Sequence, residues 1–78
     1  MSPTELLAAA GAVMFGGQWK AGLARALDVT DRTINRWLGG SVVPRRGVFV
    51  DLLSALRERR DELTQVIGEV EAYLAETK

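Results

Sequence analysis

Hydrophobic residues recur every three or four positions along the first half of the chain, which is the spacing of short amphipathic helices. The first predicted helix starts at Ser2-Pro3-Thr4-Glu5, a capping-box sequence with Pro at the first helical position, and Gly16-Gly17 ends it. The second extends from about Gln18 or Lys20 to Leu27. The third starts from a Thr30 cap and runs to Leu38, before Gly39-Gly40.

The second half of the chain reads as one long helix from about Arg45 to Glu76, because it contains no Pro after Pro44. Its first part carries a broad apolar stripe that suits a globular core. Its second part has apolar rows that resemble the seam of a coiled coil or of an antiparallel helix pair. We expect these rows to form a dimer interface of Leu56, Leu63, Val66, Ile67, Val70, Tyr73 and Leu74.

Two short helices joined by Asp28-Val29-Thr30 have the layout of a helix-turn-helix unit. Such a unit needs apolar residues inside, and Leu23, Ala24, Leu27, Val29, Ile34 and Trp37 supply them. The remaining side chains of the third helix are polar, as a helix that lies in a DNA major groove requires. Helix-turn-helix units also occur as purely structural parts of proteins that never contact DNA.

The stretch LARALDVTDRTINRWLGG resembles the XRE/Cro-type, lambda-repressor-like helix-turn-helix of phage and bacterial regulators. The likeness lies in Leu-Ala, a hydrophobic turn residue, a Thr cap and a Trp before Gly. It implies an all-α bundle of four to five helices, with the DNA-binding domain in residues 1–60 and a continuous C-terminal helix, residues 61–78, for dimerisation. Asp28 departs from the family pattern, which usually has Gly there.

The resemblance places DNA contacts on the helix at about 30–38 and at the start of the preceding helix. By position, base contacts fall to Arg32, Asn35, Arg36 and Thr33, whereas phosphate contacts or positioning fall to Gln18, Lys20, Thr30 and Asp31. An Arg can grip guanine with two hydrogen bonds, and an Asn can grip adenine in the same way. Arg45 and Arg46 follow this helix and either hold phosphates or are ordinary surface residues.

Charge and composition narrow the function classes. The chain has 78 residues, enough for one small domain, and its net charge is zero, yet residues 18–46 carry a net +4 and residues 47–78 a net −3. With no His and no Cys, we expect no enzyme, no cofactor and no metal site. The uncharged run from Leu6 to Trp19 is too short and too rich in Gly to span a membrane, and we expect a cytoplasmic protein.

The sequence therefore predicts a dimeric, sequence-specific transcription factor that binds a palindromic operator in double-stranded DNA. The resemblance implies a repressor, of phage or mobile-element origin, that controls its own operon, as anti-CRISPR-associated regulators do. No small-molecule effector is indicated. An alternative is an antitoxin-like interaction protein whose C-terminal helix binds a protein partner.

Overall fold

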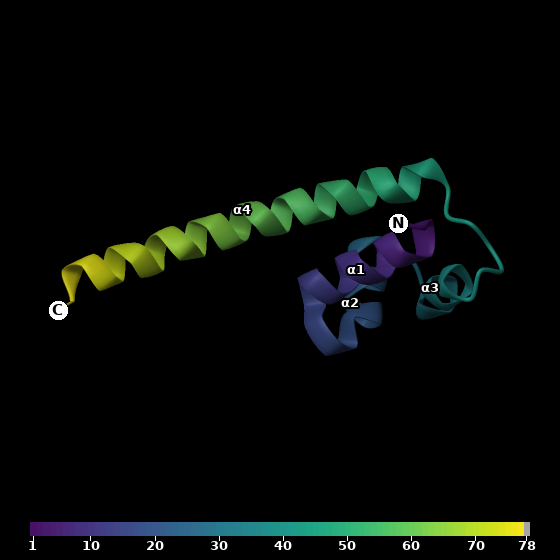
Figure 1. Ribbon diagram of the computed structural model, residues 1–78, viewed down its shortest axis with the longest axis horizontal. Coiled ribbons are helices and arrows are strands. Elements are labelled where there is room, and N and C mark those ends of the chain that lie inside the picture. Colours follow the sequence, from purple (N-terminus) through teal and green to yellow (C-terminus); the bar gives the residue numbers. More distant parts are fainter. Residues whose placement is uncertain (78) are drawn as a thin grey trace.

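The computed structural model describes residues 1–77, and all the regular secondary structure in that range is helical (Figure 1). The elements are α1 (Pro3–Phe15), a 3-10 turn η1 (Gly16–Gln18), α2 (Trp19–Ala26), α3 (Asp31–Leu38) and the long α4 (Arg46–Glu76). The prediction of an all-α chain with a long C-terminal helix is confirmed. Within these described residues, no helix combines the length and the apolar character of a membrane span.

Local side-chain caps explain where the first and third helices begin. The Ser2 hydroxyl accepts a hydrogen bond from the Glu5 N–H at 3.1 Å, and the Glu5 carboxylate accepts one from the Ser2 N–H at 3.3 Å. At α3, the Thr30 hydroxyl accepts a hydrogen bond from the Thr33 N–H at 3.2 Å. Each cap satisfies backbone donors that the helix itself leaves unpaired, so both predicted starts are confirmed.

The core forms where α1, α2 and α3 meet, with α4 closing one side. Leu7, Leu23 and Ile34 are the largest fully buried side chains, and the buried hydrophobic core consists of Leu7, Ala10, Met14, Leu23, Ala24, Leu27, Ile34, Trp37 and Leu52. The predicted inward positions of the helix-turn-helix unit are thus buried, except Val29, which is partly exposed and packs against the core. Ala24, a small residue of α2 in this core, is 4% exposed.

Two glycines allow α1 and α2 to approach closely. A Cβ atom at Gly11 would collide with the Trp19 ring, and one at Gly22 would collide with the Phe15 ring. Each aromatic side chain therefore occupies the space that a side chain on the opposite helix would need. These two contacts let α1 and α2 pack closely, and α3 packs against both of these helices.

Helix α4 begins beside α1, runs in the same direction and then continues past the rest of the molecule (Figure 1). Its first part packs on the core through Val48, Phe49, Leu52, Ala55 and Leu56. The Arg59 guanidinium carbon lies 5.2 Å from the centroid of the Phe15 ring, and every residue from Arg60 to Thr77 is exposed. The molecule measures 55 × 23 × 22 Å because of this protruding segment, residues 60–77, which we call the tail.

Candidate nucleic-acid interface

The turn between α2 and α3 is a Schellman motif. The Val29 N–H donates to the Ala24 carbonyl at 2.9 Å, and the Asp28 N–H donates to the Arg25 carbonyl at 3.3 Å. Asp28 sits at φ 56°, in the left-handed region that Gly prefers. The predicted turn is therefore formed with Asp in the position where the resembled family usually has Gly. Asp tolerates this conformation better than most residues, since its short side chain bonds locally.

Helix α3 presents one polar face to solvent and one apolar face to the core. Arg32, Asn35 and Arg36 are all exposed, whereas Ile34 is 1% exposed and Trp37 is 7% exposed. Residues three and four apart lie on the same side of a helix, so Asn35 and Arg36 both neighbour Arg32. The three predicted base-contacting side chains that are exposed are thus adjacent on an eight-residue helix.

Thr33 differs from the other predicted base-contacting residues. Its side chain is only partly exposed, and its hydroxyl shares a 3.1 Å hydrogen bond with the Thr30 hydroxyl. Thr30 and Thr33 together therefore form the start of α3, with Asp31 exposed between them in the first turn. The carboxylate of Asp31 lies at the positive end of the helix dipole, which favours it there.

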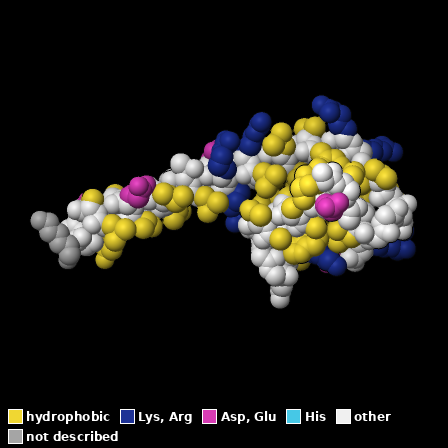
Figure 2. Space-filling view, viewed as in Figure 1, with side chains coloured by type: hydrophobic (Ala, Val, Ile, Leu, Met, Phe, Trp, Pro, Cys, Tyr) yellow, Lys and Arg dark blue, Asp and Glu magenta, His cyan; other side chains and the backbone are white. Residues whose placement is uncertain are grey.

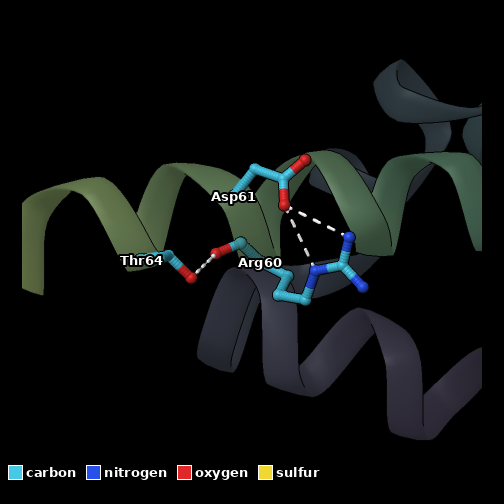
Figure 3. A network of polar contacts seen from close by, with 3 residues as sticks. All are labelled: Arg60, Asp61 and Thr64. Atoms are coloured by element: carbon cyan, nitrogen blue, oxygen red, sulfur yellow. Dashed lines mark hydrogen bonds and ion pairs between the residues drawn. The ribbon is translucent and has the colours of Figure 1, made fainter.

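The cations of α3 are not neutralised inside the molecule. Within residues 1–77, the ion pair that the structure forms joins Arg60 and Asp61 on α4, at 3.2 Å (Figure 3). Arg32 and Arg36 consequently have no acidic side chain in contact. Lys and Arg side chains also rim the end of the body that carries α3 and the start of α4 (Figure 2). This end of the molecule can attract an anionic partner without first breaking an internal ion pair.

The predicted phosphate-contacting residues lie at two helix N-termini. Gln18 directly precedes α2 and Lys20 is its second residue, and both are exposed. Arg45 directly precedes α4 and Arg46 begins it, with no acidic residue in the first turn. A helix N-terminus carries a partial positive charge, so the guanidinium groups of two arginines beside it are electrostatically unfavourable. A bound anion would relieve this repulsion. The geometry suits a phosphate at the start of α4.

One contact that anchors α3 was not predicted. The Thr4 hydroxyl on α1 donates a hydrogen bond to the Trp37 carbonyl, at 3.3 Å. At the same end of α3, a second Schellman motif joins the Ser41 N–H to the Arg36 carbonyl at 3.2 Å, with Gly40 at φ 79°. These contacts hold the C-terminal end of α3 against α1. From the sequence, Thr4 was expected only to belong to a helix start, and no local pattern signals a partner 33 residues away.

Six of the seven predicted dimer residues are exposed in the single chain. Leu63, Val66, Ile67, Val70, Tyr73 and Leu74 are each between 51% and 64% exposed and follow one side of the tail. Leu56 is partly buried because it also packs on the core of its own chain. The predicted dimerisation segment ends at Lys78, which lies outside the described residues.

Comparison of the chain with protein-family models, with curated proteins and with solved structures found no match.

Proposed function

We propose that this chain is a sequence-specific double-stranded DNA-binding protein that contacts bases through α3. The observation that carries the proposal is the two-sided character of that helix: Ile34 and Trp37 are buried, while Arg32, Asn35 and Arg36 are exposed side by side. A helix of this length with a continuous polar face fits a B-DNA major groove, which is about 12 Å wide. The preceding turn and α2 complete a helix-turn-helix of the lambda-repressor-like type that the sequence resembles.

In this proposal the exposed side chains of α3 supply the specificity. Arg32 and Arg36 are each able to donate two hydrogen bonds to guanine, and Asn35 is able to pair with the edge of adenine. Thr33 and Thr30 act mainly through the cap that orients the helix, because their hydroxyls are hydrogen-bonded to each other. Buried Ile34 and Trp37 act as positioning residues, since they decide which face of α3 reaches the DNA.

Phosphate contacts at the helix N-termini supply affinity and register. Lys20 and Gln18 lie at the start of α2, and Arg45 and Arg46 lie at the start of α4. These contacts neutralise phosphates and release counterions, but they carry no sequence information. We therefore propose a cytoplasmic regulator that binds over a promoter and blocks it, as a repressor does. This function needs no catalytic group, cofactor or metal.

We propose also that the protein is a homodimer joined through α4. The tail exposes six large apolar side chains in one stripe, more than an isolated solvated helix carries. At about 1.5–3 kcal/mol for each fully buried side chain, covering them is worth on the order of 10 kcal/mol before the costs of association. A two-fold dimer would bind an operator with matching two-fold symmetry.

Truncation after Arg60 tests the dimer. All nine buried core residues lie between Leu7 and Leu52, so the shortened chain keeps its core. We expect the full chain to sediment as a dimer at micromolar concentration and the truncated chain to sediment as a folded monomer. A full chain that is itself a monomer would instead favour the alternative function, an interaction protein whose exposed α4 stripe binds another protein.

Selection of bound duplexes from a random library tests the DNA-binding function. We expect enrichment of a two-fold symmetric sequence from a library presented to the full chain. The matched control is a chain with Arg32, Asn35 and Arg36 all replaced by Ala, which keeps the buried residues of α3. The proposal fails if the full chain enriches no sequence, or if the control chain enriches the same one.

A further inference from the structure

The structure holds an open apolar groove between α1 and α4 that its own chain leaves unfilled. The groove has a volume of 460 Å³ and is lined by Leu6, Ala9, Ala10, Val13, Phe49, Leu52, Leu53 and Leu56. A second hollow, of 370 Å³, continues it along α4, where Val13 and Leu56 meet Arg59, Arg60, Leu63 and Ile67. Leu6 and Val13 remain 43% and 81% exposed for this reason.

The groove and the apolar stripe of the tail form one continuous surface along a single side of α4. Figure 2 shows hydrophobic side chains that follow the tail and continue onto the body. The tail stripe has three rows, with Leu63 and Val70 in the middle row, Val66 and Tyr73 on one side, and Ile67 and Leu74 on the other. Three such rows cover roughly 120° of the helix, whereas the seam of a two-stranded coiled coil needs only two rows. A helix with so broad a stripe suits a groove between two helices.

We propose that each tail lies in the α1–α4 groove of a second copy of this chain, antiparallel to the α4 helix of that copy. The proposal rests on the homodimer put forward above, and it adds where the partner helix binds and in which direction. A two-fold axis near Leu63 and Thr64 makes the exchange reciprocal, so that both grooves and both tails are covered at once.

Charge favours the antiparallel direction. Residues 61–77 contain five acidic side chains and no basic one, whereas Arg57, Arg59 and Arg60 precede them on α4. A parallel pair aligned residue to residue would bring the two acidic segments together. In the antiparallel pair that sets Leu74 opposite Leu53, Glu71 lies opposite Leu56 of the second copy, one residue from Arg57 and four residues from Arg60. Arg60 is available for this contact, because its pairing with Asp61 is on the surface, with side chains 66% and 72% exposed (Figure 3).

Single cysteines distinguish the two directions, because the natural chain contains no Cys. Leu53 and Leu74 are 46% and 63% exposed, so either can be replaced without opening the core. A disulfide requires two Cα atoms within about 7 Å. The 21 positions between these residues correspond to about 31 Å along a helix. Antiparallel pairs therefore join Leu53→Cys to Leu74→Cys across two chains, while parallel pairs join Leu74→Cys to itself.

The experiment uses full-length chains of two sizes, one with Leu53→Cys and a tagged one with Leu74→Cys, mixed under reducing conditions and then oxidised. We expect the mixed disulfide dimer to form and Leu74→Cys alone to give no more dimer than Ala72→Cys, which lies on the opposite side of the tail. Leu63→Cys, near the two-fold axis, is the positive control. If Leu74→Cys links to itself and the mixed product does not form, the groove proposal is wrong but the homodimer proposal stands. If the chain is a monomer and forms no disulfide, both proposals are wrong.

Reversing the charges of the residues that pair across the proposed dimer gives a second, independent test of the antiparallel pairing. We expect Glu71→Arg to weaken dimerisation by about two- to five-fold, as loss of a surface ion pair does. Adding Arg57→Glu and Arg60→Glu should restore the affinity of the Glu71→Arg chain. Glu69→Arg is the matched control on the other edge of the tail. Equal effects of Glu71→Arg and Glu69→Arg, with no rescue, would contradict the proposed pairing.

Discussion

Replacing Asp28 by Gly tests the conformation of the turn that sets α2 against α3. Asp28 has a positive φ of 56°, a region where an L-residue is strained by roughly 1–2 kcal/mol, with Asp at the low end. Glycine relieves that strain but gains more freedom in the unfolded chain, which costs about 0.4–1 kcal/mol. The Asp28 carboxylate lies between the negative end of α2 and the positive end of α3, so its loss is nearly neutral electrostatically. We therefore expect a net stabilisation of about 0.5 kcal/mol.

Thermal unfolding followed by circular dichroism measures this effect. In a domain of this size, 0.5 kcal/mol corresponds to a rise in Tm of about 2–4 °C. The matched control is Gly40→Asp, at φ 79° in the second Schellman motif, which should lower Tm for the same reason. Asp28→Val, with a β-branched side chain, should lower Tm more strongly. A lower Tm for Asp28→Gly together with an unchanged Tm for Gly40→Asp would refute this account of the turn.

Further predictions concern the core, the α1–α2 contact and the phosphate contacts. Trp37→Ala should cost about 3–5 kcal/mol and lower Tm by more than about 12 °C, because the ring is only 7% exposed; a Tm within 3 °C of the parent would show that the ring is not needed. Gly11→Ala should cost about 1–3 kcal/mol in urea unfolding, since the new methyl group meets the Trp19 ring, whereas Gly68→Ala, with open space around it, should be neutral or stabilising. Two copies that each use Lys20, Arg36, Arg45 and Arg46 should give a slope of about −5 to −7 for log affinity against log salt. Arg45→Ala should flatten that slope and weaken all duplexes alike, and a slope near zero for the parent would contradict phosphate binding.

The elements that depend on local chemistry were predictable from sequence. The Ser2–Glu5 capping box and the Thr30 cap each join residues three apart, so a pattern of residue types specifies them. The buried and exposed sides of α3 followed from the spacing of Ile34 and Trp37 for the same reason. The position of the turn at Asp28 followed from the family resemblance.

Features that depend on how the helices pack were not predictable in this way. The roles of Gly11 and Gly22 appear only when the aromatic ring on the other helix is in place. The apolar groove exists because α4 contacts α1 on one edge and leaves Leu6 and Val13 uncovered, although both fit the helical pattern as well as buried Leu7 does. Helix α4 stops packing on the other helices at Arg59, which lies over the Phe15 ring. The sequence pattern does not change at this residue, so it does not show where the contact ends.

The most direct test of the central proposal is the affinity of single α3 variants for the selected operator and for random duplex DNA. We expect Arg32→Ala and Asn35→Ala each to lose about 1–3 kcal/mol of operator binding, roughly 5- to 150-fold, with Tm and random-duplex affinity near those of the parent. Glu58→Ala, which removes an exposed charged side chain on α4 away from α3, is the control and should leave operator binding unchanged. If Arg32→Ala and Asn35→Ala both bind the operator as tightly as the parent does, α3 does not contact the bases and the proposed function of this helix is wrong.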